Sequence, residues 1–285
     1  MSLRADVGLL TLSILFLGCS TDVGTPELVD TEAETIVRGK TDDKHAAVML
    51  LDVLTLDGGE RFCSATLYEA RTLVTAAHCL EDAGLVLAYF GNDFFGDFEQ
   101  LFEEPANWID FRLAEHWEAH PKWNPATLNA DIAIVRLDRD VPMRPIPLAN
   151  RNIGKPYEGD RMTVVGYGAA GLDEEGFPVD ALVKRRGTMV YRGNPPAKPL
   201  PPNSHPGLHD KKIRDQLMHL DGAAPSSNAC AGDSGGPVLV TIKGEEQIAG
   251  VISWGDDDCN AYTYAVRVHD FHPFLHKPAK GPKAH

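Results

Sequence analysis

The sequence predicts an all-β protein. The chain has 285 residues, of which 26 are glycine and 20 are proline, so turn-forming residues are frequent. From residue 36 onwards, short apolar runs recur between turn signals, and their lengths are typical of strands. The expected strands are Val48–Leu56, Ala65–Thr75, Gly84–Gly91, Asp131–Leu137, Arg161–Gly168, Pro237–Ile242 and Gln247–Trp254. Short helices are expected only at Leu113–His120 and Phe271–His276.

The first residues resemble a targeting segment. Arg4 precedes an apolar run over residues 7–17, which is too short to span a bilayer but has the length of a signal-peptide core. A core helix is less favoured, because nothing caps the run. We therefore expect residues 1–18 to be a signal peptide and the protein to be exported. Residues 19–35 are polar and acidic and are expected to form a linker or pro-segment.

Cys19 has two interpretations. Residues 16–19 resemble a bacterial lipobox, in which the cysteine is lipidated, although the motif prefers leucine where this chain has Phe16. The alternative is ordinary cleavage after Ser20. In the first case the protein would be a lipoprotein anchored at the cell envelope, and in the second it would be freely secreted.

Charge and cysteine content limit the partners. The formal net charge is −14, which disfavours binding to nucleic acid and to anionic lipid surfaces. A lipid on Cys19 would therefore be the only expected link to a membrane. Of the five cysteines, those beyond Cys19 can form disulfides in an exported protein.

The segment Gly232–Pro237, which reads Gly-Asp-Ser-Gly-Gly-Pro, carries the strongest chemical signal. A serine on a tight turn exposes its hydroxyl, and the N–H groups of Gly232 and Ser234 can converge to form an oxyanion hole. Glycine at position 232 allows the backbone to approach a substrate closely. These features are those that acyl transfer requires.

A serine nucleophile needs a base, and the sequence offers one upstream. His78 ends a small-residue turn after an apolar segment, and Asp131 heads the apolar run 131–137, where its burial would require a partner. With Ser234 these residues follow the order His, Asp, Ser. In such a triad the histidine takes the serine proton, and the aspartate orients the imidazole.

With these motifs, residues 36–276 resemble the chymotrypsin/trypsin-like serine peptidases, as a bacterial-type secreted or lipoprotein member. The resemblance implies two packed six-stranded antiparallel β-barrels, over about 36–140 and 141–268, with the site between them. A short C-terminal helix and a polar tail at 277–285 would follow. It also implies a monomeric serine endopeptidase that acts on protein or peptide substrates without a cofactor or metal.

The resemblance extends to activation. It implies disulfides Cys63–Cys79 and Cys230–Cys259, and it identifies Ile36-Val37-Arg38-Gly39 as the mature N-terminus, although Arg38 replaces a usual glycine. The freed amine of Ile36 would pair with Asp233. Because Thr35 precedes this site, a trypsin-like activator would not cut there, and we expect another activating protease or self-cleavage.

Substrate specificity is less defined. The resemblance assigns the pocket to Asn228, Ala229, Ser253, Trp254 and Gly255. Asn228 at the pocket base disfavours strict preference for lysine or arginine, whereas Asp256, Asp257 and Asp258 beside the entrance could attract basic substrates or could simply be solvated. Thr263, in place of a family glycine, would narrow the pocket.

Other interpretations stay open at this point. An inactive binding protein on the same scaffold is disfavoured because every triad residue is present. A metal site at His116 and His120 is also disfavoured. Asp93, Asp97 and Glu99 could bind calcium or could simply be solvated, and the proline-rich stretch 194–209 is expected to be a surface loop.

Overall fold

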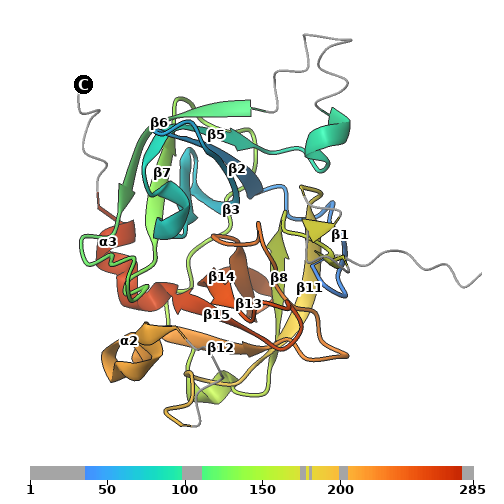
Figure 1. The fold of residues 1–285 in the computed structure, drawn as a ribbon, viewed down its shortest axis with the longest axis vertical. Helices are drawn as coiled ribbons and strands as arrows, with labels where there is room; N and C mark the ends of the chain where they lie inside the picture. Colours follow the sequence, from blue (N-terminus) through green and yellow to red (C-terminus); the bar gives the residue numbers. More distant parts are fainter. Residues whose placement is uncertain (1–35, 98–110, 174–177, 180–181, 199–204, 278–285) are drawn as a thin grey trace, which may run out of the picture. The chain divides into compact units, whose positions relative to one another are not determined.

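A computed structural model describes residues 36–97, 111–173, 178–179, 182–198 and 205–277 (Figure 1). The expected signal peptide, the acidic linker with Cys19, and the polar tail from residue 278 lie outside these ranges. Within them, no helix has the length and apolarity that a membrane crossing requires.

The first half of the described chain forms a closed antiparallel barrel in the order β2-β3-β4-β7-β6-β5. Its strands are β2 (Val48–Thr55), β3 (Glu60–Glu69), β4 (Thr72–Thr75), β5 (Ala83–Tyr89), β6 (Phe111–Ala119) and β7 (Ala133–Leu137). Their inward residues, such as Leu51, Val53 and Val135, are fully buried. A barrel closed in this way leaves no free strand edge.

The second barrel follows the order β11-β12-β15-β14-β13-β8, and pairing of β8 with β11 closes it. Its strands are β8 (Arg161–Gly166), β11 (Arg185–Tyr191), β12 (Leu217–Asp221), β13 (Pro237–Ile242), β14 (Glu245–Gly255) and β15 (Tyr262–Arg267). A small hairpin of β9 (Gly171–Leu172) and β10 (Pro178–Val179) stands apart from it. The expected fold of two six-stranded barrels is therefore confirmed.

Each end of the described chain packs on the barrel formed by the other half. Strand β1 (Lys40–Thr41) pairs with β11 of the second barrel. The C-terminal helix α3 (His272–Leu275) lies beside the first barrel, where the Tyr68 hydroxyl donates to the Leu275 carbonyl at 2.8 Å (Figure 1). These exchanged segments tie the barrels together around the cleft.

One expected helix is wrong. Residues 113–119 belong to β6, where burial alternates from Arg112 to Glu115 and the strand pairs with both β5 and β7. Alanine, leucine and glutamate favour a helix locally, but closure of the barrel supplies strand partners on both sides, so tertiary context prevails. The expected strand Ala65–Thr75 is in fact two strands, separated by a turn at Ala70 and Arg71.

Both expected disulfides are present. Cys63 on β3 is bonded to Cys79 beside the first-barrel histidine, and Cys230 is bonded to Cys259 across the base of the Ser234 turn. The short helix at the C-terminus is also confirmed, although it begins with a 3-10 turn at Val268–Phe271. Strands β11, β12 and β15 were not anticipated, because their apolar runs are short and are interrupted by glycine or threonine in β11, by His219 in β12 and by Thr263 in β15.

Candidate active site

His78 and Asp131 meet because their strands are paired. His78 lies in the 3-10 helix Ala77–Leu80 directly after β4, and Asp131 lies just before β7. The pairing of Thr75 with Ala133 brings these two segments to the same end of the barrel. The His78 Nδ1 atom is 2.8 Å from Asp131 Oδ2, and the His78 backbone N–H donates to Oδ1 at 2.9 Å.

The carboxylate of Asp131 is completely buried and fully hydrogen-bonded. Besides His78, it accepts a hydrogen bond from the hydroxyl of Ser253 on β14 of the second barrel. Burial of a charge is tolerated when donors surround it in this way. The Asp131 carboxylate can only accept hydrogen bonds, so in a neutral His78 the proton lies on Nδ1 and Nε2 is left as an acceptor. The His78 side chain is 25% exposed.

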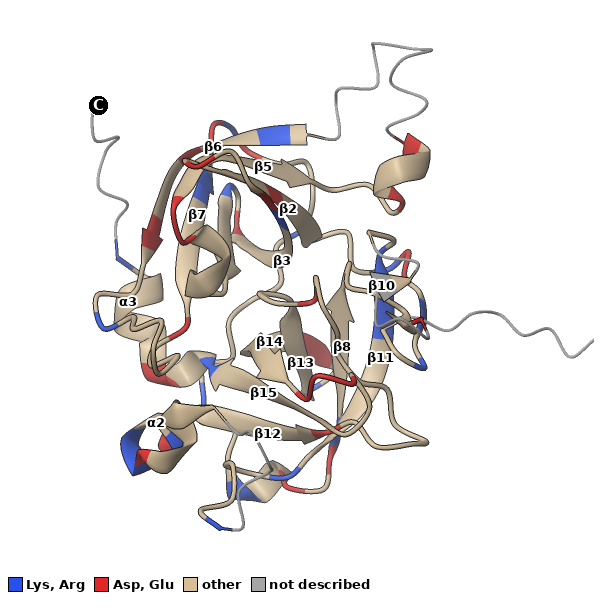
Figure 2. Ribbon diagram, in the orientation of Figure 1, with Lys and Arg blue, Asp and Glu red and all other residues tan. Residues whose placement is uncertain are grey.

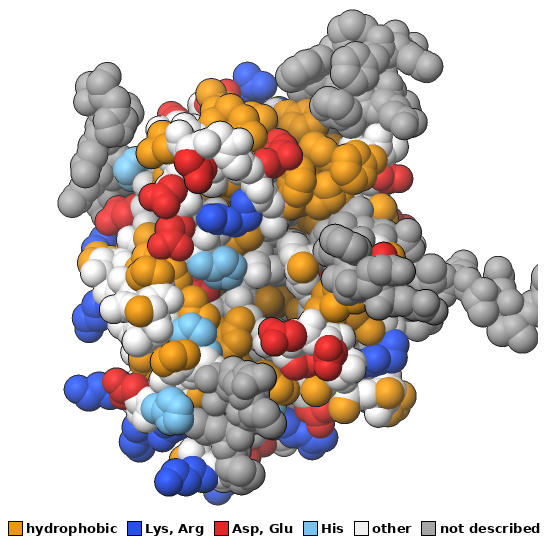
Figure 3. Space-filling view, in the orientation of Figure 1, with side chains coloured by type: hydrophobic (Ala, Val, Ile, Leu, Met, Phe, Trp, Pro, Cys, Tyr) orange, Lys and Arg blue, Asp and Glu red, His pale blue; other side chains and the backbone are white. Residues whose placement is uncertain are grey.

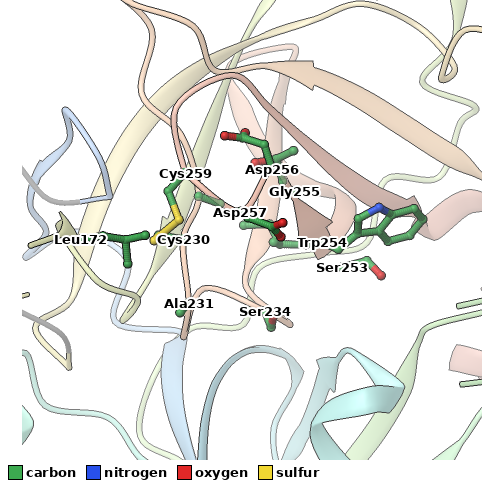
Figure 4. A pocket seen from close by; sticks show the side chains of 13 residues that line it. Leu172, Cys230, Ala231, Ser234, Ser253, Trp254, Gly255, Asp256, Asp257 and Cys259 are labelled. Carbon is green, nitrogen blue, oxygen red and sulfur yellow. A yellow bond between two sulfur atoms is a disulfide. The ribbon is translucent and has the colours of Figure 1, made fainter. Parts of the chain in front are cut away.

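Ser234 lies on a tight turn that enters β13. The turn is fixed on both sides, because the Gly235 N–H donates to Ile252 O at 2.8 Å and Ser64 N–H of the first barrel donates to Ser234 O at 2.7 Å. Ser234 lines the same pocket as Ser253, which contacts Asp131 (Figure 4). Cys79 Sγ lies 3.8 Å from His78 Nε2 and 3.7 Å from the Ser234 carbonyl oxygen, so the three expected catalytic residues lie close together.

The backbone beside Ser234 has the form of an anion-binding turn. Gly232 has φ = +97°, and a Cβ atom there would lie 2.9 Å from the Cα of Gly168, so only glycine fits. Among the described residues, no acceptor takes the N–H of Gly232 or of Ser234. These two donors are therefore available to an incoming oxygen atom.

Asp233 points into the protein between two glycines. Its carboxylate accepts the N–H groups of Gly168 at 2.8 Å and Cys230 at 2.9 Å. A Cβ atom on Gly166 or Gly168 would lie within 2.5 Å of this carboxylate. Burial raises the pKa of Asp233 to about 7, while the two backbone donors and the charge of Arg185 act in the opposite direction.

The segment from Ile36 is docked against the pocket wall. Ile36 is fully buried, and the carbonyl of Val37 accepts the Asn228 N–H at 3.0 Å. Arg38 has φ = +61°, in the left-handed region. Glycine, which Arg38 replaces at this position, adopts this region more readily than other residues. The Arg38 Nε atom donates to Ser226 O at 2.6 Å and a second nitrogen donates to Gly222 O, so the arginine side chain fastens this segment to the loop that precedes Asn228.

A pocket with a volume of about 320 Å³ is lined by Ser234. In the view of Figure 4, Ser234 and Asp256 lie at opposite ends, and the Cys230–Cys259 disulfide and Trp254 lie on opposite sides. Figure 3 shows acidic side chains beside a hollow with a hydrophobic floor on this face. The expected residues Ala229, Ser253, Trp254 and Gly255 all line it.

Asn228, which the sequence placed at the pocket base, lies behind the pocket lining. Asn228 is fully buried and is not part of the lining. Its Oδ1 accepts the Thr263 hydroxyl at 2.8 Å, and its Nδ2 donates to Asp256 Oδ1 at 3.1 Å. Thr263 and Asp256 line the pocket in front of it, so they present the surface that a substrate side chain meets.

Asp256 is a structural carboxylate as well as a pocket residue. It begins the acidic connection between β14 and β15 (Figure 2) and accepts the N–H groups of three successive residues, Asn260, Ala261 and Tyr262. Burial would raise its pKa, but these backbone donors and Asn228 outweigh burial and lower it. The pocket therefore contains a carboxylate that stays ionised at neutral pH.

Two residues near the site were not anticipated. Ser64, on β3, bonds both the Ser234 turn and the Gly232 carbonyl. His205, from the proline-rich stretch, stacks near Trp254 with ring centroids 5.7 Å apart. A lone serine in a strand and a histidine in an irregular loop carry no local pattern that would identify them.

Three of the residues considered as possible metal or calcium ligands, His120, Asp93 and Asp97, make other contacts in the described structure. The ring of His120 packs on Phe271 and Phe274 at 5.0 Å between centroids. Asp93 accepts the Gly96 N–H, and Asp97 accepts the Tyr89 hydroxyl, while Glu99 lies outside the described residues. Among the described residues, Cys63, His78 and Cys79 bring donor atoms close together, but both sulfur atoms belong to a disulfide.

Two closed six-stranded barrels, with a histidine–aspartate pair from one and a serine turn from the other facing a common cleft, define the chymotrypsin-like class of fold. The family model described as Trypsin matches residues 36–275. The chain belongs to the trypsin family.

The relatives are distant in sequence, but the similarity extends over most of this chain. Trypsin epsilon of Drosophila erecta is 27% identical over 241 residues, which cover 78% of this chain and 79% of that protein. Serine protease 56 of Mus musculus is 30% identical over 207 residues, which cover 70% of this chain and 31% of that protein. Vitamin K-dependent protein C of Oryctolagus cuniculus is 25% identical and covers 79% and 48% of the two chains. The chain thus spans only part of the larger relatives.

Solved structures agree on the fold. HL collagenase superposes with a TM-score of 0.64 at 20% identity, covering 84% of this chain and 96% of that one. GrC superposes with a TM-score of 0.65 at 20% identity, covering 83% and 96%. At this identity the likeness supports the architecture alone.

The raised pKa of Asp233 leads to a prediction about pH. In the chain with the Thr35–Ile36 peptide intact, the folded state keeps a proton on Asp233 up to about pH 7, whereas the unfolded chain releases it near pH 3.8. Stability should therefore fall by a few kcal/mol as the pH rises from about 4 to 7, and this contribution should level off above pH 7. Urea unfolding of the full-length Ser234→Ala protein, with and without Asp233→Asn, measures it. Equal pH slopes in the two proteins would contradict the prediction.

Proposed function

We propose that this protein is a serine endopeptidase that hydrolyses peptide bonds in protein or peptide substrates. The observation that carries the proposal is the hydrogen-bonded pair of His78 and buried Asp131 close to Ser234, beside two backbone donors that have no partner among the described residues. Membership of the trypsin family and the proteases among its relatives support it. All three side chains come from one chain, so the proposed site needs no second subunit and no cofactor.

In the proposed reaction, Ser234 Oγ attacks the carbonyl carbon of the substrate while Nε2 of His78 takes the hydroxyl proton. Negative charge develops on the carbonyl oxygen, where the N–H groups of Gly232 and Ser234 bind it. The C–N bond then breaks as His78 returns the proton to the amine, leaving an acyl-enzyme. Water, deprotonated by His78, hydrolyses this ester and restores Ser234. Asp131 holds the imidazole and stabilises its charged form throughout.

The role of Ser234 as the nucleophile can be tested directly. A chain starting at Ile36 should cleave members of a peptide library, and Ser234→Ala should lower kcat by about 10⁴-fold or more, because no other hydroxyl occupies this turn. Cleavage is followed by mass spectrometry on both proteins, after circular dichroism has shown both to be folded. Failure of the folded, disulfide-bonded wild-type chain to cleave any peptide would favour a binding protein on a peptidase scaffold instead.

We propose that the preferred substrate side chain is of moderate size and that strict selection of lysine or arginine is absent. Thr263 narrows the pocket, and Asn228 behind it is uncharged and already makes two hydrogen bonds, to Thr263 and Asp256. Asp256 adds an ionised carboxylate, but four donors share it, which weakens its attraction for a substrate cation. Specificity then depends on pocket depth more than on charge.

Pocket depth can be tested with Thr263→Gly. Removal of this side chain should raise kcat/KM for peptides with phenylalanine or tyrosine before the cleaved bond by roughly 10-fold relative to peptides with alanine or valine, since one to two apolar carbons change such ratios by about 1–3 kcal/mol. Thr241→Gly, on the exposed side of β13, is the matched control. An unchanged ratio would show that Thr263 does not limit the pocket.

We further propose that the chain is exported through residues 1–18 and activated by cleavage before Ile36. The freed ammonium group would pair with buried Asp233, whose carboxylate is held by two N–H groups and which lies at the start of the Ser234 turn. Thr35 excludes a trypsin-like activator. Lipidation at Cys19, as in a bacterial lipoprotein, would anchor the precursor, and the same cut would release a soluble monomer.

The mature N-terminus decides among these steps. Intact-mass analysis of the active protein recovered from an exporting bacterial host should show a chain that begins at Ile36, with its precursor carrying the added mass of lipid at Cys19. The Cys19→Ala precursor should lack that mass and appear in the soluble fraction. An active enzyme that still carries residues 19–35 would contradict activation by cleavage, and an unlipidated precursor would contradict the anchor.

A further inference from the structure

Ser64 is a fully buried serine of β3 at the junction of the two barrels. Its backbone N–H donates to Ser234 O at 2.7 Å, and its carbonyl accepts the Thr75 hydroxyl at 2.8 Å. Both backbone groups of Ser64 therefore make hydrogen bonds, and the N–H group bonds a residue of the other barrel. The side-chain hydroxyl is left to make separate contacts.

The direction of the Ser64 hydroxyl is determined by its neighbours. The Tyr167 N–H can only donate, and it lies 3.0 Å from Ser64 Oγ. The Gly232 carbonyl can only accept, and it lies 2.9 Å from the same oxygen. The hydroxyl therefore accepts from Tyr167 and donates to Gly232. A first-barrel side chain thus joins the backbone after β8 to the turn that carries the two free N–H groups.

This bond completes the anchoring of the turn. The Ala231 carbonyl accepts the Ala169 N–H at 2.8 Å, and the Asp233 N–H donates to Cys230 O at 3.0 Å. With Ser64 on the Gly232 carbonyl, the peptide planes on both sides of Gly232 are held. Glycine has little conformational preference of its own, so these contacts determine where its N–H points.

The space around the hydroxyl is too tight for a substitute. A Cβ atom on Gly166 would lie 3.1 Å from Ser64 Oγ, and one on Gly236 would lie 3.3 Å from Ser64 Cβ. Ser64→Ala would remove the hydroxyl from this closely packed site. The Gly232 carbonyl would then lack a donor, and the Gly232–Asp233 peptide would be held only by the hydrogen bond from the Asp233 N–H to Cys230 O.

We propose that Ser64 is a positioning residue for the oxyanion hole, which it orients by hydrogen-bonding the Gly232 carbonyl from the opposite barrel. This proposal rests on the peptidase function proposed above. Oriented donors act mainly on the charge that develops during reaction, so their loss lowers kcat more than it weakens substrate binding. A serine that merely filled buried hydrogen bonds would affect stability alone.

Ser64→Ala tests the proposal, with Thr66→Val as the matched control. Thr66 lies on the same strand, is fully buried, and its hydroxyl has no partner among the described residues. In the chain starting at Ile36, Ser64→Ala should lower kcat by roughly 10- to 100-fold with KM changed less than about threefold, and Thr66→Val should change neither. Affinity for a peptide aldehyde, which forms an oxyanion on Ser234, should fall in parallel, while affinity for the product peptide should not.

The results that would overturn the role of Ser64 differ from the result that would refute the peptidase function. A lowered melting temperature with unchanged kcat per titrated active site would overturn the proposal and leave Ser64 a stability residue, as would equal losses of aldehyde and product binding. If Ser64→Ala does not fold, Ser64→Gly removes the same hydroxyl with more backbone freedom and is measured at low temperature. A wild-type chain that neither cleaves peptides nor binds the aldehyde would instead refute the proposed function itself.

Discussion

The burial of the Asp131 carboxylate is the constraint on which the site depends. A charge with no access to water must be surrounded by donors, and Asp131 receives them from the backbone and ring of His78 and from the hydroxyl of Ser253. The first two come from its own barrel, but the third comes from β14 of the other. The barrels therefore have to meet in one register for the charge to be stable, and that register also brings Ser234 to the histidine.

Asp233 imposes a similar constraint on the second barrel. Its carboxylate is enclosed by glycines 166 and 168, and hydrogen bonds with Gly168 and Cys230 offset part of the cost of burying it. The raised pKa shows that this compensation is incomplete in the uncut chain. A positive charge arriving nearby would complete it, and this provides a physical reason for a cleavage-activated enzyme. Arg38 already fastens the adjoining segment, so the free energy of docking does not depend on the ammonium group alone.

Much of this arrangement could be predicted from the sequence, because the reactive residues sit in short contiguous motifs. Gly232–Pro237 encodes a turn through its glycines, and the two barrels follow from the family that the motifs identify. The sequence was insufficient where contacts between residues far apart in the chain determine the structure. Residues 113–119 have helix-forming composition but lie between two strand partners. Asn228 has the right position for a pocket base, but Thr263 and Asp256, distant in sequence from it, cover its side chain.

Ser64 illustrates why such contacts escape a reading of the sequence. Nothing next to it distinguishes a structural serine from one that orients a reactive loop, and its partners are 103 and 168 residues away. Three successive N–H groups after β8 donate hydrogen bonds to three different acceptors. Residue 167 donates to the Ser64 hydroxyl, residue 168 to the Asp233 carboxylate and residue 169 to the Ala231 carbonyl. One short segment after β8 thus holds the carboxylate, the turn and the link to the first barrel together. The same three residues therefore fix the position of the Asp233 carboxylate and of the turn that carries Ser234.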